Sequence, residues 1–255
     1  MPQATIKSTS RAGIECRYAP FLVLGALLAT SVACAQGDPG VVKLSPDAPG
    51  GPPVRDYSID TYKIRAAEYY SNGGSTVGYS WVDGPQYVIA KPKAGEVLHV
   101  AQGEVTYVAE NGSLHTIRPG DVLFIAPGSA YTARDGKNYS HNYIVFPLTV
   151  PKGAKTPQMQ LLRPSDLKPA DFSGGEHIYL GGGESAARVI AWRPAPTGSV
   201  TSAPQNRYIA VTAGSGQIVS GHSTIAFKSG DTLLLRKGAS YSWSGTDIEA
   251  ICVAF

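Results

Sequence analysis

The 255-residue sequence is short of charge and of cysteine. Only 16% of its residues are charged, and the formal net charge is +3 at pH 7. A nucleic-acid-binding protein needs a basic face to neutralise phosphates, so this near balance argues against that class. The three cysteines are Cys16, Cys34 and Cys252. If an N-terminal segment that contains Cys16 and Cys34 is removed, one cysteine remains, and a single cysteine cannot form an intrachain disulfide. Cys252 lies in the apolar run 251–255, where a buried and unreactive thiol is expected.

Glycine and proline, by contrast, are abundant, with 29 and 19 residues. They punctuate short segments in which apolar and polar residues alternate, such as 103–108 and 121–125. Such alternation is typical of β-strands with one buried face. The sequence therefore predicts an all-β protein of many short strands joined by tight turns. Its length allows one large domain or two small ones.

The first 35 residues predict an export signal. A polar stretch with two arginines precedes the apolar run 21–32, and residues 33–35 read Ala-Cys-Ala. The run is shorter than the ~20 apolar residues that a membrane-spanning helix needs. The small residues after it fit cleavage by a signal peptidase after Ala35. A lipid anchor on Cys34 and a buried hydrophobic helix are the alternatives. We expect a periplasmic or secreted protein.

The rest of the chain contains an internal repeat. Three glycines recur at offsets of 111, 110 and 110 residues, and an aspartate after the middle glycine recurs with them. The pairs are Gly103 and Gly214, Gly120 and Gly230, and Gly128 and Gly238. Both copies of the text around the last two glycines end in a tyrosine, Tyr131 and Tyr241. Agreement of spacing and of residue type predicts a duplicated β domain.

The repeat and the composition divide the chain into five parts. We expect a signal peptide over 1–35, a flexible leader over 36–55, a first domain over 56–150, a linker over 151–175 and a second domain over 176–255. The leader is rich in Gly, Pro and Asp and has no periodicity, as flexible segments do. The linker has room for one short helix around residues 164–168, where Ser165 is a suitable cap.

The repeated residues resemble the two signature motifs of the cupin superfamily. The end of its first motif, a Glu followed by six residues and a Gly, is matched by Glu96 and Gly103. Its second motif is matched by residues 120–131, with Tyr131 in the position of a histidine. The resemblance implies two tandem cupin barrels of the jelly-roll kind. Segments 75–81 and 241–243 are most similar to the branch of the ureidoglycine aminohydrolase and ethanolamine-utilisation cupins.

The metal site that this family would imply is largely missing. A cupin metal is held by imidazoles and a carboxylate that converge inside the barrel. Here Ala90 and Pro92, or the residues just before them, take the positions of the first two histidines. Glu96 is then the one ligand left in the first copy, and in the second copy Arg207 stands in the position of the glutamate. We expect no metal cofactor, and a divalent metal on other ligands is the alternative.

The candidate site of the first barrel is a cluster around Glu96. In the register of the family Glu96 points into the barrel and His99 points out. A buried carboxylate needs a partner or takes up a proton, and Lys91 or Lys93 could be that partner. With Tyr131, these residues could orient a polar ligand or move a proton, Glu96 and Tyr131 being the candidate catalytic pair. A structural ion pair without function is the alternative.

The candidate site of the second barrel consists of Arg207, Tyr241 and Trp243, which share inward parity. A guanidinium beside an aromatic wall suits a carboxylate or phosphate ligand. The alternative is a structural pair between Arg207 and a carboxylate such as Glu249. Among the five histidines, only His141 lies in an aromatic strand near the mouth of the first barrel. We expect it to be a packed or surface histidine, with a metal ligand as the alternative.

These observations favour an exported bicupin that binds a small polar or anionic molecule in its barrels, without turnover and without a cupin-type metal. The alternative is a hydrolase- or lyase-type enzyme that uses Glu96 and Tyr131 with a metal on unconventional ligands. We expect no nucleic-acid partner, and contact with a membrane only if Cys34 carries a lipid. The oligomeric state stays open, with a homodimer among the alternatives.

Overall fold

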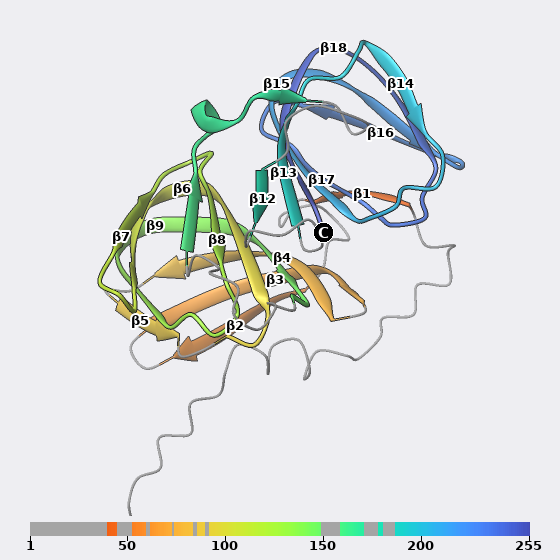
Figure 1. The fold of residues 1–255 in the computed structure, drawn as a ribbon. Helices are drawn as coiled ribbons and strands as arrows, with labels where there is room; N and C mark the ends of the chain where they lie inside the picture. Colours follow the sequence, from red (N-terminus) through yellow and green to blue (C-terminus); the bar gives the residue numbers. More distant parts are fainter. Residues whose placement is uncertain are drawn as a thin grey trace, which may run out of the picture.

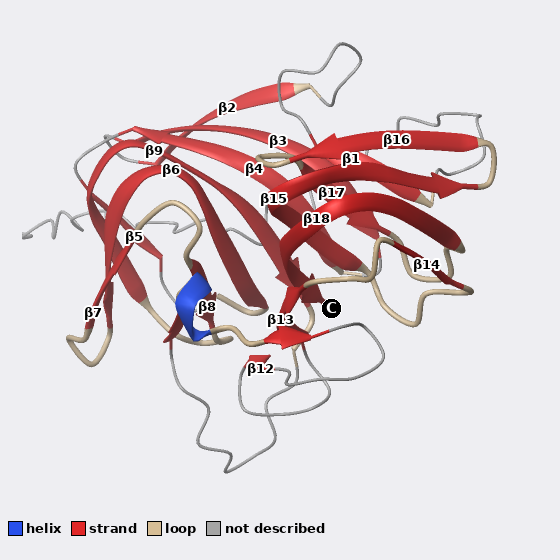
Figure 2. Ribbon diagram, turned by 90° about the horizontal axis from the view of Figure 1, so that it is seen from above, coloured by secondary structure: helices blue, strands red, loops and turns tan. Residues whose placement is uncertain are grey.

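The computed structural model describes residues 40–44, 53–59, 62–72, 74–83, 86–89, 92–148, 159–170, 178–180 and 187–255. The predicted signal peptide, Lys91 and parts of the predicted leader and linker lie outside these ranges. Within them strands predominate, and the one helical turn is the 3-10 helix η1 (Pro164–Asp166), blue in Figure 2, at the position of the predicted short helix. None of the helices in the described ranges is long and apolar enough to cross a membrane.

The strands form two nine-stranded sheets, each curled into a barrel (Figure 1). Barrel 1 has the order β10-β8-β6-β9-β4-β3-β2, with β5 paired to β9 and β7 to β6. Its strands are β2 (Val54–Ile59), β3 (Tyr62–Asn72), β4 (Ser75–Asp83), β5 (Gln86–Ile89), β6 (Gly95–Ala109), β7 (Leu114–Ile117), β8 (Val122–Ile125), β9 (Tyr131–Phe146) and β10 (Met159–Leu162). This architecture confirms the predicted all-β class.

Barrel 2 has the order β1-β17-β15-β18-β13-β11, with β12 paired to β13, β14 to β18 and β16 to β15. Its strands are β1 (Val41–Leu44), β11 (Pro169–Ala170), β12 (Ile178–Leu180), β13 (Ala187–Trp192), β14 (Thr197–Val200), β15 (Arg207–Ser220), β16 (Ser223–Lys228), β17 (Thr232–Leu235) and β18 (Tyr241–Ala254). The long antiparallel pair β15 and β18 corresponds to β6 and β9 of barrel 1.

Alternation along the strands separates a core inside each barrel from a layer between the barrels. On β6, Leu98 and Val100 belong to the core of barrel 1, whereas Val97 belongs to the layer between the barrels. Successive side chains of a strand point to opposite faces, so a strand that is buried on both sides must be apolar on both. Each fully buried aliphatic side chain of this kind contributes about 1.5–3 kcal/mol.

The glycines of the sequence repeat all have left-handed backbones. The φ angles are 76° and 75° at Gly103 and Gly214, 90° and 89° at Gly120 and Gly230, and 79° and 81° at Gly128 and Gly238. A side chain with a Cβ is strained in this region, which is why both copies have glycine at the same irregularity of the long strand, in β6 or β15, and at the same two turns. The repeated glycines therefore reflect backbone conformations that the two barrels share.

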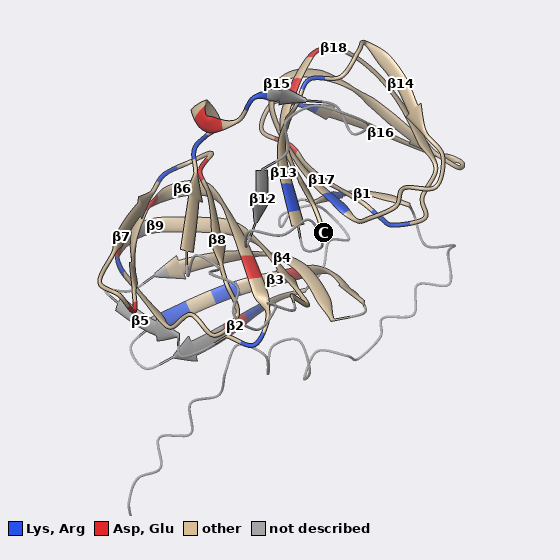
Figure 3. Ribbon diagram, viewed as in Figure 1, with Lys and Arg blue, Asp and Glu red and all other residues tan. Residues whose placement is uncertain are grey.

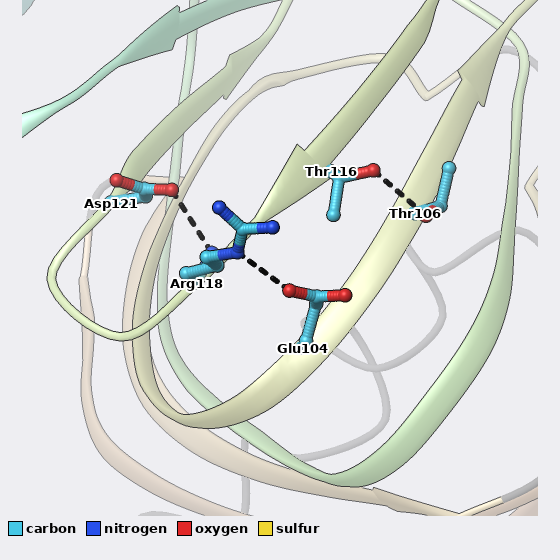
Figure 4. Close-up of polar contacts among 5 residues, drawn as sticks. All are labelled: Glu104, Thr106, Thr116, Arg118 and Asp121. Atoms are coloured by element: carbon cyan, nitrogen blue, oxygen red, sulfur yellow. Dashed lines mark hydrogen bonds and ion pairs between the residues drawn. The ribbon is translucent and has the colours of Figure 1, made fainter.

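The aspartate of the repeat closes the same turn in both barrels. Asp121 accepts a hydrogen bond from the backbone N–H of Arg118 at 3.0 Å, and Asp231 accepts one from Lys228 at 2.8 Å. Figure 4 shows the turn of barrel 1, where the Arg118 side chain also pairs with Glu104 at 2.6 Å. In the same view the hydroxyls of Thr106 and Thr116 lie 3.1 Å apart and link β6 to β7. These polar contacts stabilise a turn rather than a ligand site.

Each barrel receives the strand that precedes the other barrel in the sequence. Strand β1, before barrel 1, pairs with β17 of barrel 2, and β10, before barrel 2, pairs with β8 of barrel 1 (Figure 1). The registers correspond, because Leu44 faces Thr232 and Leu162 faces Val122, positions related by the 110-residue offset. The expected leader and linker therefore belong to the barrels in part. Four-residue strands between prolines and glycines carry too little alternation to be recognised.

The outer faces of the two barrels pack against each other through a shared apolar layer. Phe124 and Ile144 of barrel 1 and Val253 of barrel 2 belong to it. Within this layer Nδ1 of His99 lies 2.8 Å from the hydroxyl of Tyr208, and both side chains are buried. His99 thus points out of barrel 1, as predicted, but it meets barrel 2 instead of solvent. Burial lowers the pKa of His99 to about 4, so the imidazole is neutral at pH 7.

Candidate functional site

Glu96 and Tyr131 meet inside barrel 1, as the sequence predicts. Glu96 lies near the start of β6 and Tyr131 begins β9, and the Tyr131 hydroxyl donates a 3.3 Å hydrogen bond to Oε2 of Glu96. Burial raises the pKa of the Glu96 carboxyl to about 7, and the bond from Tyr131 offsets part of this effect. A carboxyl of this pKa carries its proton about half of the time at neutral pH.

A cavity of about 10 Å³ lies beside this pair, lined by Glu96, Tyr131, His141 and four further residues. It has room for one water molecule at most. His141 is buried and stacks on Tyr139 with ring centroids 4.9 Å apart, and its Nδ1 has no hydrogen-bond partner among the described residues. Burial lowers the pKa of His141 to about 3, so a neutral imidazole faces the cavity. The sequence singled out His141 but did not connect it with Glu96.

Of the two predicted lysine partners of Glu96, the one that the structure describes, Lys93, does not lie beside it. Lys93 is exposed in the turn before β6 and does not line the cavity, while Lys91 lies outside the described residues. The side chain of Lys93 is long, but its ammonium group stays hydrated because the turn is exposed. Burial raises the pKa of the Glu96 carboxyl, and the hydrogen bond from the neutral Tyr131 hydroxyl offsets only part of that rise.

The residues present do not fit a metal ion of the cupin type. Within the described ranges there is no group of three or more His, Cys, Asp or Glu side chains that could hold one. Glu96 and Tyr131 occupy two of the family's ligand positions, and a phenol with a usual pKa of about 10 is a poor ligand at neutral pH. The chemistry that this pair offers is acid–base exchange at a carboxyl and hydrogen bonding from a hydroxyl.

The second barrel brings Arg207 and Tyr241 together at the equivalent place. Arg207 begins β15, is buried, and donates a 2.6 Å hydrogen bond from Nη1 to the Tyr241 hydroxyl. Burial raises the pKa of Tyr241 to about 12, against the lowering effect of the Arg207 charge, so the phenol stays neutral. Both barrels thus hold a tyrosine against an inward charged residue, negative in barrel 1 and positive in barrel 2.

Trp243 lies next to this pair but has a different polar contact. Its ring centroid is 6.4 Å from that of Tyr241, and its Nε1–H donates to the backbone carbonyl of Ala195 at 3.0 Å. Glu249, the expected structural partner of Arg207, forms a partly exposed ion pair with Arg193 at 3.1 Å. Arg207 and Tyr241 are therefore brought together as predicted, whereas the pair with Glu249 is not formed.

A much larger hollow lies at the mouth of barrel 1, and no residue of it was proposed as a site from the sequence. Its volume is about 710 Å³, within the usual range for small-molecule sites. Two basic side chains of β3, Lys63 and Arg65, line it together with Trp81 of β4. Figure 3 shows the basic positions on β3. Gln102, Asn138, Ser140 and Asp56 add polar groups, and Ile64, Val82 and Tyr139 reach it from the interior.

We call this hollow the mouth groove. The guanidinium carbon of Arg65 lies 5.2 Å from the centre of the Trp81 ring, a cation–π contact. Asp56 is 3.5 Å from Nε of Arg65, and both side chains are largely exposed. The alternation Lys-Ile-Arg in residues 63–65 could have indicated a basic strand face, but not that Trp81 and Gln102 lie opposite it.

Comparison with known proteins agrees with this architecture. Residues 87–137 match the EutQ-like cupin domain family. The solved structure of YlbA from E. coli superposes with a TM-score of 0.60 at 17% identity, over 90% of this chain and 95% of that one. A cupin 2 conserved barrel domain protein from Leptotrichia buccalis gives a TM-score of 0.58 at 11% identity, over 78% and 91%.

A third similar structure is Streptomyces albus HEPD with 2-hydroxyethylphosphonate and Fe(II) bound, which gives a TM-score of 0.59 at 9% identity, over 86% and 77% of the two chains. Identities this low establish the fold alone. A search among curated proteins gives no match. The matched segment and the two jelly-roll barrels show that the chain has the cupin fold.

Proposed function

We propose that this protein is an exported cupin that binds a small anionic molecule at the mouth of barrel 1, without a cupin-type metal and without turnover. The observation that carries the proposal is the mouth groove, about 710 Å³ in volume, with Lys63 and Arg65 side by side on one face of β3. The cavity inside the barrel is about 10 Å³ and is too small for a ligand. We therefore assign binding to the mouth of the barrel and not to its interior.

The charge of the groove supports an anionic ligand. Among the described residues that line it are two basic side chains and one acidic side chain, and the ion pair between Arg65 and Asp56 is exposed. Exposed pairs of this kind contribute little, about 0–1 kcal/mol, because water competes for both partners. An anion can therefore compete with Asp56 for the donors of Arg65 at low cost. Trp81 holds the guanidinium by its cation–π contact, which reduces the entropy lost on binding.

The test is a thermal-shift screen of the purified protein against small carboxylates and phosphates. Lys63→Met/Arg65→Met removes the charge of the groove, and Lys93→Met removes an exposed charge of the same barrel that does not line it. A ligand at 100 times its Kd stabilises the folded state by about 2.7 kcal/mol. We expect stabilisation of the wild type and of Lys93→Met, and its loss in the double variant. Equal stabilisation of all three, or no stabilisation by any anion, would contradict the proposal.

Export is part of the proposal. It rests on the apolar run 21–32 with the small residues 33–35 after it. A lipid on Cys34 is the alternative form of the same export route, and it would hold the protein at a membrane surface. No nucleic acid is needed as a partner, because the charge of the chain is close to balanced.

The second candidate function is catalysis by Glu96, favoured by a carboxyl pKa of about 7. A group of this pKa can both accept and release a proton at neutral pH. Ile64 and Val82 line both the small cavity and the mouth groove, so a ligand in the groove would contact two side chains of the cavity that holds Glu96. Turnover of a groove ligand that disappears in Glu96→Gln, while binding is retained, would favour the enzyme.

A further inference from the structure

We infer that the ligand of the mouth groove is a hydroxylated monocarboxylate, bound by its carboxylate to Lys63 and Arg65 and by its hydroxyls to the amides of Gln102 and Asn138. This inference rests on the proposed function and names its ligand class. The groove is distinct from the small interior cavity that Glu96 and Tyr131 line.

The charges of the residues that line the groove favour an anion with a single negative charge. Among the lining residues whose side chains the structure describes, Lys63 and Arg65 contribute two positive charges, and Asp56, 3.5 Å from Arg65, contributes one negative charge. The net charge of +1 of these three residues matches a carboxylate. A phosphate monoester carries close to two negative charges at pH 7, one more than these residues balance, and the second would lie close to Asp56. The lining thus selects a monoanion by repelling a dianion.

The hydrogen-bond donors of Lys63 and Arg65 are arranged to suit a carboxylate. Residues 63 and 65 share one face of β3, since side chains two apart on a strand point the same way. Arg65 is held by Trp81 on one side, with its guanidinium carbon 5.2 Å from the ring centre, and Trp81 is held in turn by Tyr79 at a centroid distance of 4.6 Å. A guanidinium fixed in this way presents a planar pair of N–H donors, the arrangement that a carboxylate accepts best.

Polar residues of β6 and β9 line the groove together with the basic strand β3. Gln102 of β6 and Asn138 of β9 line the groove with amide groups, and both residues are exposed. An amide offers donors and an acceptor, which suits a hydroxyl that also donates and accepts. Ser140, the third polar residue on this side, already accepts a 2.7 Å hydrogen bond from Tyr79. A ligand without hydroxyls gains no hydrogen bond from these exposed amides, which stay paired with water.

The experiment measures the binding of four probes to the purified protein by isothermal titration at pH 7. Gluconate carries one carboxylate and five hydroxyls, hexanoate has the charge alone, sorbitol has the hydroxyls alone, and glucose 6-phosphate has hydroxyls with a dianion. We expect gluconate to bind at least about tenfold more tightly than each of the others, a difference of about 1.4 kcal/mol. Arg65→Met should reduce gluconate binding to the level of sorbitol, and Lys93→Met should leave it unchanged.

A further variant isolates the hydroxyl contacts. Gln102→Met keeps the length of the side chain but removes its donor and acceptor, so it should weaken gluconate and leave hexanoate unchanged. If hexanoate or glucose 6-phosphate binds as tightly as gluconate and loses its binding in Arg65→Met, the ligand class is wrong while the proposed anion site stands. If no probe binds in a manner sensitive to Arg65, both the ligand class and the proposed function are wrong.

Discussion

Replacing Glu96 by Gln should stabilise the protein at alkaline pH and leave it nearly unchanged at acidic pH. The carboxyl has a pKa of about 7 in the folded chain, against 4.5 as the ordinary value. Below pH 4.5 it is protonated in both the folded and the unfolded state, and glutamine is then a close substitute that can still accept the hydrogen bond of Tyr131. Between pH 4.5 and about 7 the unfolded chain releases its proton first, so the free energy of unfolding falls as the pH rises.

The size of the effect follows from the difference in pKa. One pH unit corresponds to about 1.4 kcal/mol, so the ionisable carboxyl costs the folded state about 3 kcal/mol once the pH is above 7. The Gln variant should lack this loss and should be more stable than the wild type by about that amount at pH 8. The assay is urea denaturation at pH values from 4 to 8.5, with the free energy of unfolding plotted for both proteins.

The difference between the two proteins isolates Glu96 from the buried histidines. The pKa values of His99 and His141 are lowered to about 4 and about 3, so their contribution is present above pH 6.5 and is lost as the pH falls toward these values. Both proteins share this loss, and it cancels in the comparison. Glu110→Gln, at an exposed turn, is the matched control and should follow the wild type. Parallel curves for Glu96→Gln and wild type between pH 4.5 and 8 would refute the reasoning.

Four shorter predictions test other parts of the molecule. Leu44→Ala should lower the free energy of unfolding by about 2–5 kcal/mol and speed hydrogen exchange in β17, because Leu44 is buried on the exchanged strand β1; a loss below about 1 kcal/mol would contradict the pairing. Arg207→Met and Tyr241→Phe should show a coupling energy of about 1–3 kcal/mol in a double-mutant cycle, and no coupling would mean that their hydrogen bond has no energetic role. Elemental analysis should find far less than one Mn, Fe, Ni or Zn per chain, and near-unit occupancy that Glu96→Ala removes would refute this. Intact-mass analysis of the exported protein should show a chain that begins at Gln36, or one that begins at a diacylated Cys34. A chain that retains Met1 would contradict both forms.

Local backbone requirements made the fold readable from the sequence. The six glycines of the repeat have left-handed backbones, where other residues are strained; four lie in turns and two at irregularities of the long strands β6 and β15. The aspartates after Gly120 and Gly230 accept hydrogen bonds from the same turns. Such demands act within a few residues and leave a signature in the order of residues. The inward parity of Glu96 and Arg207 follows from strand alternation in the same local way.

Contacts between distant segments could not be read in this manner. His141 lies in sequence 45 residues from Glu96 and faces the same small cavity only because β9 pairs with β6 in one register. The mouth groove combines side chains of β3, β4, β6 and β9, and strand β1 joins the barrel that lies farther along the chain. The sequence alone determined the two barrels, their turns and which residues point inward, because these depend on local geometry. Only the tertiary structure decided which inward and outward side chains meet, because strand pairing across the barrels depends on the packing of the whole chain.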